Sequence, residues 1–421
     1  KNKDIKLKEK RIIIIENGKI KDITTDKSKI NGLKTIDLKG KYILPGLINL
    51  HVHLPGSGMP KDTKKQNKES VNRVLRNPLT RKIVYYLCKK YAMTELMSGV
   101  TTIRTVGGLS HIDTDIRDNI NKGKITGPRI LASNMAISVP GGHMAGVLAY
   151  EATSPQEGVK FVDIIAKDNP DLIKLMITGG VLDAKVKGEP GEMKMSSEIV
   201  KACCERAHEL GLKVAAHVES PEGVKVAVEN GVDTIEHGGK ISAEVLEIFK
   251  KRKACQVMTL SAPIPLMFLP YEQTHGLPLH KYNSTVVFDG MIQCAKNLRK
   301  EGILVGLGTD TACPYITHYD MWRELNYFHN FMGVSNKEAL YIATLLNATI
   351  AGIDHETGSI DIGKYADMLI IEKNPLEDLS NLRKPIYVIV NGKLIKPRVK
   401  KFKIVEQSLD RFNKTTKYSL K

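Results

Sequence analysis

Six residues of types that bind metals or move protons lie at or near the ends of short apolar runs. They are His51, His53, Lys174, His217, His237 and Asp310. His51 and His53 are two positions apart, and because side chains alternate along a strand, both imidazoles point to one side. Imidazole and carboxylate groups together favour zinc, iron, nickel, cobalt or manganese over calcium or magnesium. The set therefore predicts a transition-metal site, although any one of these histidines alone would more often be structural.

Lys174 does not fit a metal site as an ammonium ion, because its charge repels a cation and it has no lone pair to donate. Burial among other positive groups lowers the pKa of an amine. The neutral amine can then react with carbon dioxide to form a carbamate, an anion whose two oxygens can bridge two metal ions. The alternative interpretation is a lysine paired with an acidic neighbour outside the site.

The elements that must position these residues alternate between short apolar runs and amphipathic stretches. The apolar runs are residues 43–52, 100–104, 129–132, 172–177, 214–217, 234–237, 255–258 and 303–307. Helix-like stretches between most of them are residues 82–96, 155–167, 196–210, 221–229, 243–251 and 286–300. Eight strands with intervening helices predict a (β/α)8 TIM barrel, an α/β fold whose chemistry lies at the C-terminal ends of its strands.

Both ends of the chain have the pattern of β structure. Residues 11–15 and 386–390 are apolar runs closely followed by an Asn-Gly pair, the strongest short-range signal of a hairpin. We therefore expect a small β-sandwich domain formed by residues 1–42 and 358–421, with the barrel, residues 43–357, inserted between them. Residues 399–421 are rich in lysine and poor in apolar side chains, so we expect a loosely packed basic tail there.

Length, composition and charge narrow the class of protein. The 421 residues include 42% hydrophobic and 26% charged side chains, which is typical of a globular protein larger than one minimal core. The net charge of +17 is concentrated in residues 1–11, 61–90 and 396–421, where lysine outnumbers arginine, whereas base recognition favours arginine. We therefore expect a solvated lysine-rich surface and no nucleic-acid partner. No apolar run approaches the roughly 20 residues that span a bilayer, so we expect no membrane partner either.

The cysteines and the start of the chain bear on its location. The six cysteines are scattered without a C-x-x-C pair, so we expect no disulfide framework. No apolar signal-peptide core opens the chain, although it begins at Lys1 rather than at methionine. We expect a cytoplasmic protein.

The segments around the six residues resemble the amidohydrolase superfamily, from about residue 11 to residue 396. The resemblance rests on the His-x-His pair after Pro45-Gly46-Leu47-Ile48, and on Ile-Lys-Leu-Met-Ile-Thr-Gly-Gly, Ala-Ala-His-Val-Glu, Thr-Ile-Glu-His-Gly and Gly-Thr-Asp around the others. The binuclear subgroup with a carbamylated lysine fits best. Within it, the segments that begin at Gly99, Gly141 and Gly358 are similar to the imidazolonepropionase-like branch, which includes Xaa-Pro and Xaa-Arg dipeptidases.

This resemblance implies a binuclear centre with two divalent ions, which we expect to be zinc. His51, His53 and Asp310 would hold one ion, His217 and His237 the other, and Lys174, as N6-carboxylysine, would bridge both together with a hydroxide. Two such ions make hydroxide attack on an amide feasible near neutral pH. Asp310 would take the proton of the hydroxide and deliver it to the leaving nitrogen.

His143, in Gly-Gly-His, is the candidate for holding the substrate carbonyl or carboxylate, and the alternative is a loop histidine bonded to the backbone. We therefore expect a dipeptidase or carboxypeptidase-like hydrolase of prolidase type, acting on dipeptides or N-acyl amino acids. We also expect a homo-oligomer. The runner-up is a cyclic amidase such as an imidazolonepropionase, because the same metal centre opens ring amides.

Two segments depart from the family pattern, and two further classes of protein are alternatives to this interpretation. Asn49 stands before the His-x-His pair where the family usually has aspartate, and we expect it to weaken a contact behind the ligands. Residues 261–283 form a long predicted loop, on which substrate identity depends.

A mononuclear deaminase would need His-x-x-Glu, but Ser220 stands in the place of that glutamate. A non-catalytic metal-binding relative would lack ligands, whereas all six are present.

Overall fold

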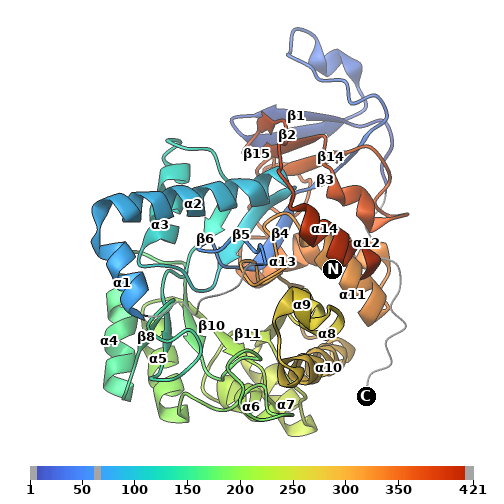
Figure 1. Ribbon diagram of the computed structural model, residues 1–421. Coiled ribbons are helices and arrows are strands. Elements are labelled where there is room, and N and C mark those ends of the chain that lie inside the picture. The colour runs from blue at the N-terminus through green and yellow to red at the C-terminus, as the bar shows by residue number, and fades with distance from the viewer. Residues whose placement is uncertain (1–6, 61–67, 413–421) are drawn as a thin grey trace.

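The computed structural model describes residues 7–60 and 68–412, and its centre is a barrel of parallel strands (Figure 1). The barrel strands are β4 (Leu47–Val52), β5 (Val100–Thr105), β6 (Arg129–Leu131), β9 (Leu172–Met176), β10 (Lys213–Val218), β11 (Thr234–His237), β12 (Cys255–Met258) and β13 (Val305–Leu307). Pairing runs from β4 to β6 and from β9 to β13. Backbone bonds from Asp310 to His51 (2.9 Å) and from Asp171 to Ala132 (2.8 Å) join the two arcs. The predicted TIM barrel is confirmed.

Two short strands complete the third position of the barrel. β7 (Ala136–Ser138) follows β6 and pairs in parallel with β9, while β8 (Ala149–Glu151) pairs in parallel with β7. The chain between β6 and β7 turns at Asn134, whose φ of 59° lies in the left-handed region. The third position is therefore shared between β6, which contacts β5, and β7, which contacts β9.

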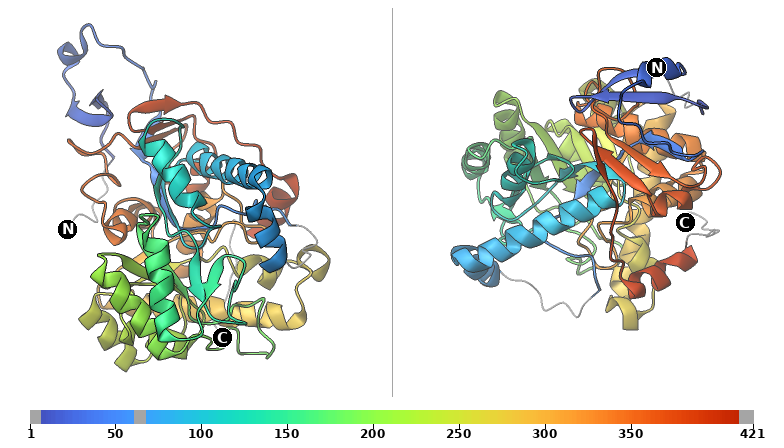
Figure 2. Two further views of the ribbon diagram at one scale, coloured as in Figure 1. Left: turned by 90° about the vertical axis from the view of Figure 1, so that its left-hand side faces the viewer. Right: turned by 90° about the horizontal axis from the view of Figure 1, so that it is seen from above.

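Helices surround the barrel, as two further views show (Figure 2). They are α1 (Lys68–Arg76), α2 (Pro78–Met97), α3 (Ile112–Asn121), α4 (Pro155–Ala166), α5 (Ser197–Glu209), α6 (Pro221–Glu229), α7 (Ala243–Arg252), α8 (Ile264–Phe268), α9 (Tyr271–Thr274), α10 (Pro278–Lys300), α11 (Met321–Met332), α12 (Asn336–Tyr341), α13 (Asn347–Ala351) and α14 (Lys403–Leu409). The predicted long loop at residues 261–283 instead contains α8, α9 and the start of α10. Prolines at or just before the start of each of these helices suit a helix N-terminus but have the sequence pattern of a loop.

Four helices of the barrel begin in the same way. Ser154, Ser196, Ser220 and Ser242 precede α4, α5, α6 and α7, and each side chain accepts a hydrogen bond from a backbone N–H three residues later. This bond satisfies a donor that the first helical turn leaves unpaired, which is why serine is favoured there. The caps fix the ends of the loops that leave the C-terminal side of the strands.

Both ends of the chain build two small antiparallel sheets beside the barrel (Figure 1). One contains β1 (Ile12–Glu16) and β2 (Lys19–Thr24), and the other contains β3 (Tyr42–Pro45), β14 (Met368–Ile371), β15 (Tyr387–Val390) and β16 (Lys393–Ile395). Asn17-Gly18 and Asn391-Gly392 turn the two hairpins with positive φ at both residues, as a type I′ turn requires. Apolar side chains of both sheets, including Ile20 and Met368, share one core. A β-sandwich built from both termini is confirmed.

The first predicted strand, residues 43–52, is two strands in the structure. β3 pairs with β14 in the small sheet, whereas β4 belongs to the barrel. The chain changes sheets at Gly46, where an added Cβ would lie 2.0 Å from Thr101 Oγ1, so only glycine fits. The proposed domain boundaries, at residues 42 and 358, stay a prediction.

Part of the predicted basic tail is packed rather than loose. α14 buries Val405 and Leu409 beside Tyr315, and Glu406 pairs with Arg323 at 2.9 Å. The sequence did not predict this contact, because lysines alternate there with isolated apolar residues and the partners of those residues come from a distant segment. Residues 413–421 of the predicted tail lie outside the described residues.

Within residues 7–60 and 68–412, no helix is long and apolar enough to cross a bilayer. All six cysteines are free thiols. The expected lack of a disulfide framework agrees with the structure.

Candidate metal centre

The six predicted residues lie together at or near the C-terminal end of the barrel. They are carried by β4 (His51) and the residue after it (His53), β9 (Lys174), β10 (His217), β11 (His237) and the turn after β13 (Asp310). Oδ1 of Asp310 lies 3.3 Å from Nε2 of His51 and 3.2 Å from Nε2 of His53. The His237 ring lies between those of His51 and His217, with centroid distances of 4.9 and 4.8 Å.

Two sets of potential ligand atoms are tight enough to hold an ion. The atoms of His51, His237 and Asp310 lie within 4.8 Å of one another, and so do those of His217, Glu219 and His237. His237 is common to both sets, so the grouping differs from the division that the family resemblance implies. Glu219 was not predicted as a ligand, although it stands two residues after His217.

Lys174 is buried at the centre of this arrangement. Its Nζ has no hydrogen-bond partner among the described residues. The pKa of its amine is lowered to about 8, mainly by burial; the Arg104 charge also lowers it, while Glu236 and Asp310 act in the opposite direction. A lysine in this state is not the alternative predicted above, which pairs with an acidic neighbour outside the site. The orphaned buried nitrogen is consistent with a group that takes up a further substituent.

The charges of the surrounding side chains also suit cation binding. Burial holds the pKa of His217 and of His237 well below the usual range, which keeps both rings neutral with a lone pair available. Burial alone would raise the pKa of Asp310, but His51 and the hydrogen bonds from His51 and His53 hold it well below the usual range. The centre therefore combines the neutral imidazoles of His217 and His237 with the ionised carboxylate of Asp310.

A buried ion pair orients His51. Nδ1 of His51 lies 2.7 Å from Glu236, whose other oxygen accepts bonds from Arg104 (2.6 Å) and from Thr234 Oγ1 (2.8 Å). Arg104 also donates to the backbone carbonyl of Leu50 at 2.7 Å. Neither Glu236 nor Arg104 was predicted as a site residue. A charged residue in the middle of each of two apolar strands was the signal that could have revealed them.

The other imidazoles are also held through one nitrogen. Nδ1 of His53 donates to the carbonyl of Gly107 at 2.8 Å, and Nδ1 of His237 lies 2.7 Å from Thr259 Oγ1. Nε2 of His217 lies 3.1 Å from the carbonyl of Gly179. The rings of His217 and His237 therefore keep their second nitrogen for another partner, whereas that of His53 already faces Asp310. His237, with φ of 62°, has the left-handed backbone conformation that concentrates at functional sites.

His143 lies against this cluster. Its ring stacks on that of His217 with centroids 4.2 Å apart, and its Nδ1 lies 2.5 Å from Oδ2 of Asp183. Asp183 also accepts from the backbone N–H of Gly180 at 3.1 Å. The partner of His143 is thus a carboxylate rather than the backbone, which differs from the alternative predicted above. Asp183, which orients the ring, was missed because it lies forty residues along the chain.

A second buried glutamate fixes the segment behind His237. Glu324 of α11 accepts from the backbone N–H groups of Leu260 and Ser261, both at 2.7 Å, and from Ser261 Oγ at 2.6 Å. These residues follow Thr259, which contacts His237. Glu324 therefore anchors the start of the segment that was predicted to be a long loop.

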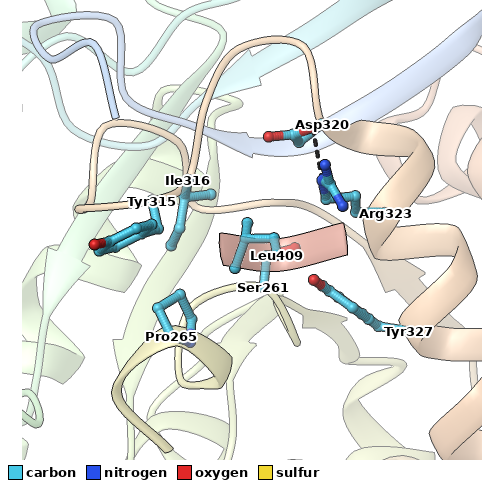
Figure 3. A pocket seen from close by; sticks show the side chains of 8 residues that line it. All are labelled: Ser261, Pro265, Tyr315, Ile316, Asp320, Arg323, Tyr327 and Leu409. Carbon is cyan, nitrogen blue, oxygen red and sulfur yellow. Dashed lines mark hydrogen bonds and ion pairs between the residues drawn. The ribbon is translucent and has the colours of Figure 1, made fainter. Parts of the chain in front are cut away.

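A small pocket beside α11 and α14 contains none of the predicted site residues. Its walls include Ser261, Tyr315, Tyr327 and an Asp320–Arg323 ion pair of 3.0 Å (Figure 3). Arg323 is further neutralised by Glu406 and Asp410 of the C-terminal segment. Because its charges are paired internally, this pocket is a less favourable place for chemistry than the barrel mouth.

The comparisons with known proteins are consistent with this centre. The model of the amidohydrolase family matches residues 42–395. The structure of a putative prolidase from Bifidobacterium longum has a TM-score of 0.82 and 35% identity, covering 95% of this chain and 93% of its own. A Xaa-Pro dipeptidase with methionine bound in its active site has a TM-score of 0.76 and 28% identity, covering 91% and 94%. Ochratoxinase from Aspergillus niger is 27% identical over 330 residues, which is 72% of this chain but only 66% of that relative.

Proposed function

Because the chain belongs to the amidohydrolase family, we propose that it is a metal-dependent hydrolase that cleaves an amide bond in dipeptides or N-acyl amino acids. The observation that carries the proposal is the convergence of four histidines and one aspartate around a buried lysine amine. The amine has no hydrogen-bond partner among the described residues. A structural cluster would be expected to satisfy such a group internally.

The donor set fits two divalent ions, with zinc as the proposed metal. His51, His53 and Asp310 would hold one ion and His217 with His237 the other, while carbamylated Lys174 would supply an oxygen to each. Neutral imidazoles and an ionised carboxylate are what such ions require. Glu219 is a further candidate because it lies within 4.8 Å of the second pair.

When bound, the two ions would acidify a water molecule and polarise the substrate carbonyl. Asp310 can take up the proton of the attacking water on a carboxylate oxygen and deliver it to the leaving nitrogen. His143 uses Nδ1 for Asp183, which leaves Nε2 for a substrate carbonyl or carboxylate oxygen. The stacking on His217 fixes the plane of the His143 ring.

Similarity to the prolidase and the Xaa-Pro dipeptidase favours dipeptides as the substrate class. Ochratoxinase is a more distant guide because the match spans less than two thirds of its length. The segment with α8 and α9 follows the C-terminal end of β12, so its side chains are candidates for selecting the substrate.

The test is hydrolysis by the metal-loaded protein of a panel of dipeptides and N-acyl amino acids, with hydantoins and imidazolone propionate alongside. The expected result is release of a free amino acid from one of the first two groups. The Asp310→Asn variant is the control, because it should bind the same compounds without turnover. Turnover of only the cyclic amides would favour the cyclic amidase, and metal binding without any turnover would favour a non-catalytic relative.

We also propose that the protein is a cytoplasmic homo-oligomer. α2 presents an exposed apolar stripe on which Leu79, Ile83 and Tyr86 are 67%, 51% and 60% exposed. These residues recur on one helix face, and contiguous exposed apolar surface is typical of a contact site. Light scattering of the purified protein would detect the oligomer, and Ile83→Glu should shift it towards the monomer.

A further inference from the structure

A buried polar cluster lies directly behind His51 and Asp310. It contains Asn49 of β4, Glu95 of α2 and His318 from the segment after β13, which are 0%, 1% and 2% exposed. None of these three side chains has a role in the proposed reaction. The cluster nevertheless contacts the strand end that carries His51 and the turn that carries Asp310.

The Asn49 side chain joins those two strand ends. Its Oδ1 accepts from the backbone N–H of Thr309 at 3.1 Å and from that of His51 at 3.3 Å. Its Nδ2 donates to Thr309 Oγ1 at 2.7 Å and to Oε2 of Glu95 at 3.4 Å. Two backbone donors face one end of the side chain, and the Glu95 carboxyl oxygen faces the other. Since the Thr309 hydroxyl can either accept or donate, Glu95 is the neighbour that makes an amide match this position better than a carboxylate.

Glu95 is itself fixed in place. Its Oε1 lies 3.2 Å from Nδ1 of His318, and Nε2 of the same ring donates to the carbonyl of Gly56 at 2.7 Å. The His318 ring also stacks on Tyr91 with centroids 4.9 Å apart. The carboxylate of Glu95 therefore cannot turn away from Asn49 without breaking this arrangement.

We propose that Asn49 and Glu95 are a matched pair of positioning residues that hold His51 and Asp310 in register. An aspartate at position 49 would place its second oxygen where Nδ2 now lies, facing Oε2 of Glu95 in a buried site. The two oxygens would then face each other with no hydrogen atom between them to form a bond. Asparagine is thus the residue that Glu95 requires, rather than a weakened form of the usual aspartate. The inference rests on the proposed function only for its metal-binding and kinetic readouts.

The test compares Asn49→Asp, Glu95→Gln and the double variant Asn49→Asp/Glu95→Gln in the full chain. Asn49→Asp should lower the unfolding midpoint in chelator and weaken zinc binding by about 10- to 100-fold, as is typical of residues that orient ligands. The Asn49→Asp substitution should lower kcat by a larger factor than it changes KM, because it displaces the ligands without contacting substrate. Glu95→Gln alone should change little, because an amide can still accept from Asn49. The double variant should recover most of the loss in the unfolding midpoint and in zinc binding, because the glutamine amide at position 95 in that variant can donate a hydrogen bond to the aspartate at position 49.

Asn72→Asp on the exposed face of α1 is the matched control, since it adds the same charge away from the cluster and should match wild type. An unchanged midpoint and unchanged zinc binding in Asn49→Asp would overturn the proposal. So would a double variant no better than Asn49→Asp, including the case in which neither folds. If the wild-type chain binds no zinc, the proposed function fails. The unfolding midpoints of the single and double variants in chelator can still be compared, and that comparison decides the present proposal.

Discussion

Replacing Arg104 with methionine should destabilise the barrel by an amount that follows from its contacts. The guanidinium, with 6% of its side chain exposed, lies 2.6 Å from a carboxylate oxygen of Glu236, which is fully buried. Methionine keeps much of the side-chain volume but leaves that carboxylate without its counter-ion. Breaking a buried pair from one side costs about 3–5 kcal/mol. Coulomb's law gives an attraction of about 4 kcal/mol for two unit charges about 4 Å apart at an effective dielectric constant of 20, which agrees with this cost.

This cost converts into a measurable shift of the unfolding midpoint. With an unfolding entropy of about 2.1 cal/mol/K per residue, 421 residues give roughly 0.9 kcal/mol/K. For a single cooperative transition, the loss corresponds to a Tm lower by about 3–6 °C. The assay is calorimetry of the metal-free protein in chelator, so that metal loss does not contribute.

Two further variants make the interpretation specific. Arg104→Met/Glu236→Gln removes both charges and should recover at least half of the lost stability. Arg76→Met on exposed α1 should stay within about 0.5 kcal/mol of wild type. A Tm change in Arg104→Met no larger than in Arg76→Met, or a double variant as unstable as Arg104→Met, would refute the reasoning.

Four other predictions concern the proposed metal site and the approach of substrate to it. Elemental analysis should find about two transition-metal ions per chain. Lys174→Met should lose both metal and activity, and short carboxylic acids should partly restore the activity of Lys174→Ala. Wild-type activity in Lys174→Met would show that the residue is only structural. Asp310→Asn should abolish turnover, whereas His143→Ala should weaken binding and turnover while the metal content is retained; unchanged kinetics in His143→Ala would remove it from the site. If the basic segment at residues 61–90 steers carboxylate substrates, a dipeptide should be cleaved faster than its C-terminal amide. The difference between the two rates should shrink as the salt concentration rises. Equal rates at all salt concentrations would exclude both steering and recognition of the carboxylate.

The sequence predicted the elements whose signal is local, and missed those that depend on a distant partner. The barrel strands were visible as apolar runs, and both hairpins as Asn-Gly turns. The division of the first run at Gly46 was hidden, because only the approach of Thr101 shows why the chain changes sheets there. The clustering of the histidines followed from strand polarity, since all C-terminal strand ends of a barrel meet on one face.

The missed site residues share a different property. Glu236 sits beside a predicted ligand, but its role depends on Arg104 from another strand, which no spacing along the chain reveals. Asp183 orients His143 across a loop that has no periodic pattern. α8 and α9 are too short for a helical period to emerge, and their prolines favour a loop. Pairings of this kind become visible only when the tertiary arrangement is known.

The pairing of β3 with β14 has a consequence for how the protein is made. β3 belongs to the N-terminal part of the chain, while β14 follows the last barrel strand, so their ladder joins segments separated by the entire barrel. During synthesis the edge of β3 has no partner until the C-terminal segment has left the ribosome. An unpaired strand edge invites association with other chains. We therefore expect a ribosome-bound nascent chain ending before β14 to need chaperone protection, and a circular permutant that joins the two termini to shorten this vulnerable interval.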